Sequence, residues 1–500
     1  MYKKLMLASL AITLNTNAMN SLESANNTLL NAPAHIKNIM NSAPATYNYT
    51  SKFSRSSSVS YTGQAFRQVL INDIKSYMTS LKRGGHDSVD TLTALNSYFA
   101  YNENTDAYID EIINGDSIFK VKAKGLDGQA LYIYEGDFYS DIQSPGKNLS
   151  SKIAGNDNPL RRKELKGWSS FKVGNIDLRK VNADNKGDSF AEPEDLVQAF
   201  FQTISNNAEN GQAFSVKNGD LEIQRVSGAY ITEDGLDLAQ LVQKTFHGAV
   251  SYSQAAGDYL ATTTSVTGGL NSGNTTPDKP GKAYTSMEHH FDEAFGYFGA
   301  ARDYNSYTDV QIASKLSIDT NNDGEISVLS ELNQGLSTNF SRMDLIAKNY
   351  GFEMDLSGNT MTAFIQGRQL ITKAPADYKK YVVALANKAL GNWEKTLAAV
   401  TIHYINSTIS QMDAYGTKAY LFTNHAKFWS EMKGFALSFQ FSPVSIMSDA
   451  QFDELHTLLA DKPALHKNGL DTVVKYKSDL TKARELLNSI YAFPTTSSNW

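Results

Sequence analysis

Apolar residues recur at helical spacing through most of the second half of this 500-residue chain. Such a period predicts amphipathic helices, and helices of this length joined by short links favour bundles. The expected fold is therefore all-α, mainly helical, with two packed helical bundles. The pattern predicts helices over 236–262, 284–301, 343–351, 377–412, 423–439 and 449–489.

The first half of the chain carries fewer helical patterns. One runs over 64–85, and helical spacing resumes at Pro193. Between them, residues 115–185 combine many glycines with two short alternating runs, 117–123 and 130–135. Two such runs around glycines are typical of paired strands. We therefore expect an irregular insertion that includes a short β-hairpin.

Two further segments, residues 19–60 and 263–283, differ in composition from the helical parts of the chain. Residues 19–60 are rich in Asn, Ser, Thr and Ala and have weak periodicity, which predicts a tether or a loosely docked segment. A loop rich in Gly, Ser, Thr, Asn and Pro covers 263–283. We expect a single domain over 61–490, made of two helical halves, 61–262 and 284–490, that this loop joins.

The N-terminus has the pattern of a secretory signal peptide over residues 1–18. Lys3 and Lys4 precede an apolar run, Leu5–Leu14, that is too short to span a bilayer, and a small-residue cleavage site follows. The alternative is an ordinary N-terminal helix. Because the chain has no cysteine, it lacks the residue that carries a bacterial lipid anchor. The pattern predicts a periplasmic or extracellular protein.

Charge and composition exclude several classes of partner and chemistry. The formal net charge is −6, and the charged residues are interspersed, so no basic stripe indicates a nucleic-acid partner. No later apolar run reaches the roughly eighteen residues of a membrane span. The absence of cysteine excludes disulfides and thiol nucleophiles. The sequence also lacks a His-Glu-x-x-His helix, a Gly-x-Ser-x-Gly elbow and a phosphate-binding loop.

The densest polar cluster is Glu288–Glu293, where two imidazoles and three carboxylates fall within a predicted helix. His289 and Glu293 are four residues apart and His290 and Glu293 three, so either pair can meet on one helix face. Glu288 and Asp292 form a second pair of acids. One imidazole and one carboxylate are too few for a transition metal, so other helices must contribute ligands. The alternative is a hydrogen-bonded core histidine beside solvated acids.

Three residues of later helices are candidate partners for this cluster. Glu394 lies beside Trp393 at the edge of an apolar stripe, which predicts a buried carboxylate. His425 lies within the apolar stripe of the next helix, and Glu431 flanks that stripe. A histidine in such a stripe is more often part of the core than a ligand.

A second constellation resembles the first half of a calcium-binding loop. Asp319, Asn321 and Asp323 supply side-chain oxygens at alternate positions, and a glycine and Glu325 follow. The acid expected at position twelve is replaced by serine, and Glu331 follows one residue later. We expect Ca²⁺ binding closed by the shifted acid, with a polar turn as the alternative.

Ordered segments along 45–490 also resemble a family of exported bacterial proteins catalogued as domain-of-unknown-function family 4856. The family is similar to the imelysin-like proteins, which are helical, exported and associated with bacterial iron uptake. The imelysin signature Gly-x-His-x-x-Glu corresponds here to His290–Glu293, with Glu288 in place of the glycine. The segments that carry the resemblance are Met287–Gly299, Tyr61–Arg67, Phe246–Tyr252, Gly367-Arg368, Asn392–Lys395, His403–Asn406 and Ser430–Phe435.

Three functions are consistent with these observations. The first is an exported module that binds a metal ion, Fe or Zn, or a small ligand, and that the resemblance links to iron uptake. The second is a metal-dependent hydrolase in which Glu293 or Glu394 acts as a base. The third is a structural or protein-interaction module whose polar residues hold helices together.

Overall fold

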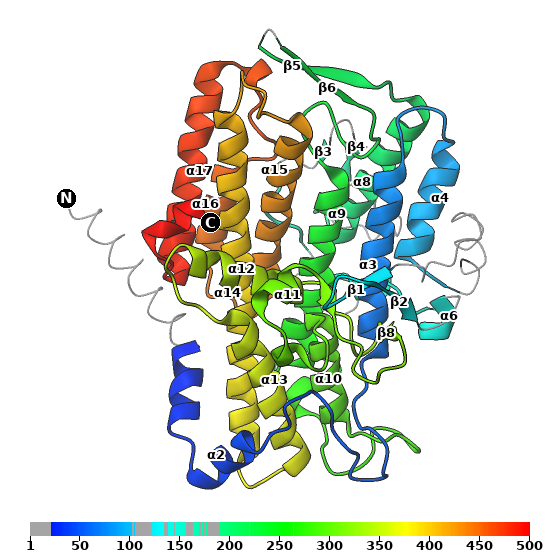
Figure 1. Ribbon diagram of the computed structural model, residues 1–500, viewed down its shortest axis with the longest axis vertical. Coiled ribbons are helices and arrows are strands. Elements are labelled where there is room, and N and C mark those ends of the chain that lie inside the picture. Colours follow the sequence, from blue (N-terminus) through cyan, green and yellow to red (C-terminus); the bar gives the residue numbers. More distant parts are fainter. Residues whose placement is uncertain are drawn as a thin grey trace, which may run out of the picture.

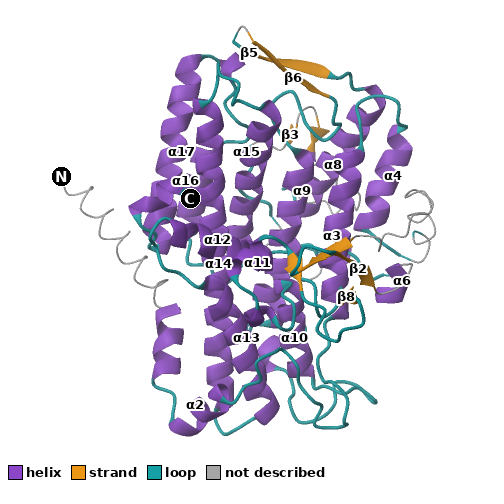
Figure 2. Ribbon diagram, in the orientation of Figure 1, coloured by secondary structure: helices purple, strands orange, loops and turns teal. Residues whose placement is uncertain are grey.

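The computed structural model describes most of the chain and is mainly helical (Figures 1 and 2). The expected signal peptide, residues 1–18, lies outside the described residues, as does part of the expected insertion at 115–185. None of the described helices has the length and apolarity of a membrane span. The described residues are 22–102, 105, 122–134, 139–144, 146–156, 164–169, 172–173, 176–178, 190–219, 221–263 and 265–500.

The first helical group comes from the first half of the chain and stands on one side of the molecule (Figure 1). Helices α4 and α8 begin at polar caps: the Asp87 side chain accepts hydrogen bonds from two first-turn N–H groups, and Glu192 and Asp195 form a capping box. The group comprises α3 (Thr62–Ser80), α4 (Ser88–Phe99), α8 (Pro193–Asn210) and α9 (Leu238–Phe246), with the short α6 (Tyr139–Ile142) beside α3.

The second helical group is built around α14, which runs through both the upper and the lower part of the molecule (Figure 1). Its 36 residues correspond to about 54 Å of helix. Helices α13, α15 and α17 pack along it. The group comprises α12 (Ser337–Asn349), α13 (Leu356–Lys373), α14 (Tyr378–Asp413), α15 (Phe422–Ala436), α16 (Asp449–Leu459) and α17 (Leu470–Tyr491), with short α11 (Asp309–Ala313) against α12.

The two groups share one hydrophobic core. Helix α9 packs against α15, and α10 (Ser286–Phe298) contacts both α3 and α13. After α9 the chain continues as two π-helical segments, η2 (His247–Tyr252) and η3 (Ala255–Tyr259). Gly248 lies so close to Ser438 of η6 (Leu437–Phe441) that a β-carbon would overlap it. This close approach lets the π segment reach the second group.

The described chain also contains short strands, which form three small sheets. The expected hairpin is present as β1 (Lys122–Gly125) and β2 (Ala130–Tyr134), which pair antiparallel. The distant β7 (Leu316–Ser317) and β8 (Glu325–Ser327) extend it to a sheet in the order β7-β1-β2-β8. Two further hairpins are β3 (Lys172–Val173) with β4 (Ile176–Asp177), and β5 (Phe214–Asn218) with β6 (Leu221–Val226), which lies across the top of the molecule (Figure 2).

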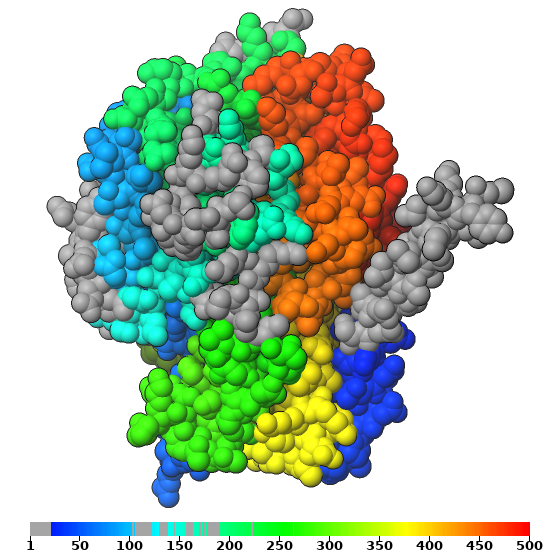
Figure 3. Space-filling view, turned by 180° about the vertical axis from the view of Figure 1, so that it is seen from behind, coloured from blue at the N-terminus to red at the C-terminus, as the bar shows by residue number. Residues whose placement is uncertain are grey.

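The described part of the N-terminal segment, residues 22–60, is packed into the fold, so the prediction of a tether or a loosely docked segment was wrong there. Residues 22–30 and α2 (Ala34–Asn41) are helical, and α2 packs on α13. Tyr47 is fully buried and stacks on Phe295 with ring centroids 3.8 Å apart. The space-filling view shows this segment (blue) against α13 and α14 (yellow) at the lower end (Figure 3). The burial of its tyrosines stabilises the packed segment despite its polar composition.

Two predicted helices also differ from the structure. The pattern over 449–489 is split into α16 and α17, because the chain turns at Ala460, whose φ is 58°, and Pro463 follows. The pattern over 236–262 is α-helical only in its first part and π-helical afterwards. Helix α13 was not predicted. The remaining short turns of 3-10 helix are η1 (Ser150–Lys152), η4 (Gly269–Asn271), η5 (Tyr304–Ser306), η7 (His466–Asn468) and η8 (Thr495–Asn499).

Candidate functional site

Helix α10 carries the dense polar cluster, and its start explains the role of Glu288. The Thr285 hydroxyl accepts a hydrogen bond from the Glu288 N–H, and Glu288 Oε2 accepts one from the Thr285 N–H at 2.9 Å. This capping box satisfies two free N–H groups of the first turn. Glu288 Oε1 remains available for a partner from another helix.

That partner is Arg368 of α13, which joins both acids of the pair Glu288 and Asp292. Its NH1 donates to Glu288 Oε1 at 3.0 Å and its Nε donates to Asp292 Oδ1 at 2.8 Å. The guanidinium also donates to the Ser58 hydroxyl at 2.8 Å and lies 4.9 Å from the Tyr49 ring centroid. The side chains of Arg368 and both acids are at most 1% exposed. We call these three residues the Arg368 centre.

All carboxylate oxygens of the Arg368 centre accept hydrogen bonds. The Tyr47 hydroxyl donates to Asp292 Oδ1 at 2.9 Å, and the Ser60 N–H donates to Oδ2 at 3.1 Å. Burial alone would lower the pKa of Arg368, but the charges of Asp292 and Glu288 raise it above its usual value. With two carboxylates on one guanidinium and every oxygen hydrogen-bonded, this centre joins α10, α13 and the N-terminal segment.

The other polar residues of α10 have separate partners. His289 Nε2 lies 3.8 Å from Glu293 Oε1, the predicted four-residue spacing, while its Nδ1 faces the Ser60 carbonyl at 3.1 Å. Glu293 accepts a hydrogen bond from the Gln64 amide at 2.8 Å, and burial raises its pKa. Each of these groups is held by a neighbour in the fold.

His290 is a buried histidine of α10 that contacts the loop preceding this helix. Its Nδ1 lies 2.9 Å from the Ser272 hydroxyl and 3.2 Å from the Gly269 carbonyl, so the loop holds the ring in place. Among the described residues, no three His, Asp or Glu side chains come together in a way that could hold a metal ion. The polar side chains around α10 are hydrogen-bonded or ion-paired to one another and to neighbouring segments.

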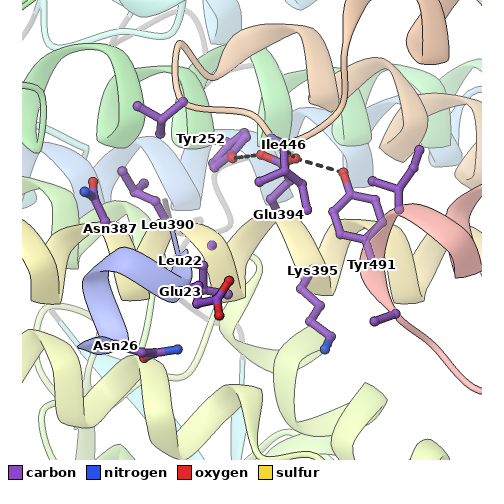
Figure 4. Close-up of a pocket in the computed structure, with 14 residues that line it drawn as sticks. Leu22, Glu23, Asn26, Tyr252, Asn387, Leu390, Glu394, Lys395, Ile446 and Tyr491 are labelled. Atoms are coloured by element: carbon purple, nitrogen blue, oxygen red, sulfur yellow. Dashed lines mark hydrogen bonds between the residues drawn. The ribbon is translucent and has the colours of Figure 1, made fainter. Parts of the chain in front are cut away.

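Glu394 lies in a different environment, on α14 at the junction of the two helical groups. The Tyr252 hydroxyl donates to Oε2 at 3.0 Å, and the Tyr491 hydroxyl donates to Oε1 at 2.8 Å. The Ser445 hydroxyl and the Ile446 N–H also donate to Oε1, at 2.9 and 3.0 Å. Figure 4 shows the two tyrosines approaching the carboxylate from opposite sides. The four donors come from η2, α17 and the loop before α16.

Within the described part of the chain, no cation forms an ion pair with this carboxylate. Glu394 is 3% exposed, and it forms no ion pair with any described residue. Burial raises its pKa, whereas the hydrogen bonds from Tyr491, Ser445 and Tyr252 oppose that shift. A buried carboxylate without a positive partner is unusual, because the charged form is poorly solvated away from water.

A cavity of about 280 Å³ lies directly beside Glu394. Its walls are mainly apolar and include Leu390, Ile446 and Ile490, together with both tyrosines. Residues Leu22 and Glu23 of the N-terminal helix close one side (Figure 4). Leu22 packs on Gly391, where an added β-carbon would come within 2.9 Å of the leucine. We call this the Glu394 cavity.

The remaining candidates, His425 and Glu431, belong to a third region. His425 is 1% exposed, its Nδ1 lies 3.4 Å from the Tyr420 hydroxyl, and burial lowers its pKa to about 4. Glu431 lies 3.4 Å from the Lys244 ammonium inside the helix contact between α9 and α15. These residues share no partner with Glu394 or with His290, so the six candidates form three sets.

The predicted calcium loop lies between β7 and β8. The Asp319 carboxylate accepts a hydrogen bond from the Gly324 N–H at 2.8 Å, and Asn321 and Asp323 accept bonds from N–H groups of the same turn. Gly324 has a φ of 89°, which suits glycine at the sharp turn. Glu325 begins β8, so its backbone pairs with β2.

Glu331, the shifted acid, spans the two ends of this loop. Its Oε1 accepts hydrogen bonds from the Thr320 N–H, at 2.8 Å, and from the Thr320 hydroxyl. Its Oε2 accepts one from the Ser327 N–H at 2.9 Å. The acid closes the loop through the backbone, and calcium binding stays a prediction.

Sequence reasoning missed the residues that complete the two carboxylate centres. Arg368 was noticed as part of a Gly-Arg motif, and the adjacent Gly367 lies against the Phe291 ring, so the glycine permits the close helix approach. Tyr252 ends one of the segments that carry the family resemblance, but no local pattern links Tyr252 or Tyr491 to Glu394, because they lie 142 and 97 residues from it along the chain.

Comparison with known proteins places the chain in a family. A family model described as a domain of unknown function, DUF4856, matches residues 173–482, which is narrower than the expected 45–490. No curated protein and no solved structure matches the chain. The matched segment includes α10, Arg368 and Glu394, and it covers more than half of the 500 residues. The chain belongs to the DUF4856 family.

Proposed function

We propose that this protein binds a small ligand in the Glu394 cavity, and that the ligand is an apolar molecule with a positively charged amine. The observation that carries this proposal is the buried carboxylate without a cation at the wall of an apolar cavity. Ligand pockets in proteins are commonly apolar with a few placed polar groups that fix orientation.

The hydrogen bonds around Glu394 leave room for such a ligand. Oε1 already accepts three hydrogen bonds, whereas Oε2 accepts one, from Tyr252. A carboxylate oxygen can accept about two hydrogen bonds, so Oε2 retains acceptor capacity. An ammonium group there would supply the missing positive charge, and the apolar walls would cover its hydrocarbon part. A charge-assisted bond of this kind stabilises a complex by about 1.5–3 kcal/mol.

Isothermal titration calorimetry with three probes of one shape tests the proposal. The full chain is titrated with phenethylammonium, with neutral 2-phenylethanol and with anionic phenylacetate. We expect the cation to bind at least about tenfold more tightly than the other two probes. Equal affinity for the three probes, or no binding of the cation, would refute the proposal.

Two variants connect the binding to this cavity. Glu394→Gln keeps the shape and removes the charge, so the preference for the cation is expected to disappear. Val444→Trp places a large ring at the cavity wall from a position that is 46% exposed, and binding of every probe should weaken. Val474→Trp, on the exposed face of α17, is the matched control and should change nothing. Unchanged binding in Val444→Trp would place the ligand elsewhere.

Export, iron uptake and metal binding are separate proposals that rest on sequence. We propose that residues 1–18 direct the chain to the periplasm or the exterior, which mass spectrometry of the mature N-terminus would test. The likeness to imelysin-like proteins suggests Fe or Zn as a further ligand. Elemental analysis of the protein purified from its host compartment would detect either metal, and a metal-free protein would remove that link.

A further inference from the structure

A second pocket of about 350 Å³ opens between α3, α9 and α15, away from the Glu394 cavity. The three helices stand side by side (Figure 1). The two pockets have no lining residue in common. This second pocket is polar, and lysines, an aspartate and a glutamine contribute to its wall. We call it the α3–α9–α15 pocket.

One wall of the pocket is positively charged. Lys75 of α3 and Lys427 of α15 both line it, and neither ammonium forms an ion pair or a hydrogen bond with a described residue. Burial lowers the pKa of Lys75, with the nearby Glu431 and Asp237 opposing that shift. The first turn of the 15-residue helix α15, at Asn424, reaches the same pocket and adds its positive end. This wall suits an anionic group such as a carboxylate.

Acceptor groups of α9 also line the pocket. Asp237 caps α9, and its Oδ1 accepts a hydrogen bond from the Gln240 N–H at 3.0 Å. The Gln240 side chain is 5% exposed, lines the pocket, and has an Oε1 with no hydrogen-bond partner among the described residues. A buried amide without a partner destabilises a fold by about 1–3 kcal/mol unless another molecule satisfies it. A donor group on a ligand would do so.

A buried ion pair lies at the contact of α9 with α15. Lys244 lies 3.4 Å from Glu431, and the Lys244 ammonium also donates to Gln243 Oε1 at 2.7 Å. Both residues of the pair are under 10% exposed. Neither of them lines the pocket, whose charged lining residues are Lys75, Lys427 and Asp237.

We propose that the α3–α9–α15 pocket binds a small zwitterion of the amino-acid class. Its carboxylate would lie between Lys75, Lys427 and the start of α15. Its ammonium would face Asp237 and the unpartnered amide of Gln240. Two ammonium groups and a set of acceptors in one pocket match the two charged groups that every free amino acid carries on one carbon. This inference does not depend on the Glu394 cavity.

A thermal-shift screen of the full chain with the twenty common L-amino acids is the first test. Calorimetry then compares the amino acid that stabilises best with two halves of it: the same skeleton without the ammonium, and the same skeleton without the carboxylate. We expect each half to bind at least about tenfold more weakly, because each loses one charge-assisted contact. No stabilising amino acid, or a half that binds as tightly as the whole, would overturn the proposal.

Three variants assign that binding to the pocket. Lys75→Met keeps most of the stem and removes the charge, and Asp237→Asn keeps a good N-cap while removing the charge of the carboxylate. Each should weaken binding at least about tenfold. Lys379→Met, at an exposed position of α14, is the control and should leave affinity within twofold. Affinity that survives both pocket variants would show that the amino acid binds elsewhere. Binding that persists in Glu394→Gln would separate this site from the Glu394 cavity.

Discussion

The Arg368 centre and the Glu394 cavity both bury carboxylates in the same helical body, but the carboxylates have different partners in the two places. At the Arg368 centre, one guanidinium contacts two acids within 3.0 Å and every oxygen has a donor. At Glu394, four neutral donors surround one acid, and no described cation reaches it. The first arrangement is closed to a ligand. The second lies beside a cavity, and Glu394 Oε2 can accept one further hydrogen bond there.

This difference shows why a dense polar motif does not by itself mark a site. The cluster on α10 is conspicuous in sequence because five ionisable residues fall close together, yet their partners are other parts of the fold. Glu394 is a single acid beside a tryptophan, and what makes it a candidate is the absence of compensating charge. Buried charge that lacks a partner is the better indicator of an external one.

Removing the guanidinium of Arg368 should produce the largest loss of stability. In Arg368→Met two buried carboxylates lose their cation, and the free energy of unfolding should fall by about 3–5 kcal/mol. Urea denaturation of the full chain measures it. Arg55→Met, at an exposed arginine, is the control and should change stability by less than about 0.5 kcal/mol. A loss at Arg368 as small as that of the control would contradict a structural role for the centre.

Neutralising one acid in each region tests the comparison directly. Asp292→Asn breaks an ion pair and should cost about 2–3 kcal/mol of stability. Glu394→Gln breaks no ion pair and keeps an acceptor oxygen, so its unfolding free energy should stay within about 1 kcal/mol of the wild type. Both are read from the same denaturation series. Equal losses in the two variants would mean that an unrecognised cation neutralises Glu394.

His290 should behave as part of the structural network. His290→Ala removes the partner of Ser272 and of the Gly269 carbonyl, so stability should fall by about 1–2 kcal/mol. Affinity for phenethylammonium should not change. His290→Asn, which can still hydrogen bond, should recover part of the loss. Ligand binding that depends on His290 would restore the view of α10 as the functional site.

The pH dependence of stability should carry the signature of Glu394. Burial raises its pKa above the usual 4.5, so the folded state holds this proton to a higher pH than the unfolded chain does. The unfolding free energy of the wild type relative to Glu394→Gln is therefore at its maximum below pH 4.5. It decreases as the pH rises through the pKa of Glu394 in the folded state. Unfolding of both proteins across this range measures the difference. A constant difference would mean that Glu394 has the same pKa in both states.

The smallest expected effect belongs to the calcium loop. Calcium should raise the melting temperature by about 1 °C, in line with a stabilisation near 1 kcal/mol for a chain of this size. Asp319→Ala combined with Asp323→Ala should abolish the rise, while magnesium is the control ion for the wild type. An equal response in the wild type and the variant would leave the loop as a polar turn.

Local patterns in the sequence predicted much of this architecture. The stripes of α10, α14 and α15, the hairpin of β1 and β2 and the contact of His289 with Glu293 all follow from spacing within one element. Burial of Glu394 was expected from its place beside Trp393 and is confirmed. Helix α13 was missed because its apolar residues are interrupted by glycine, threonine and glutamine.

Sequence by itself determined the helical class, the family and the burial of Glu394, because periodicity, motifs and apolar neighbours act over a few residues. Only the tertiary structure decided which acids are neutralised. Arg368 reaches its two carboxylates across 76 and 80 positions of chain, and Tyr252 and Tyr491 meet Glu394 from two other segments. Whether a buried charge has a partner depends on the packing of distant helices, which no local spacing encodes.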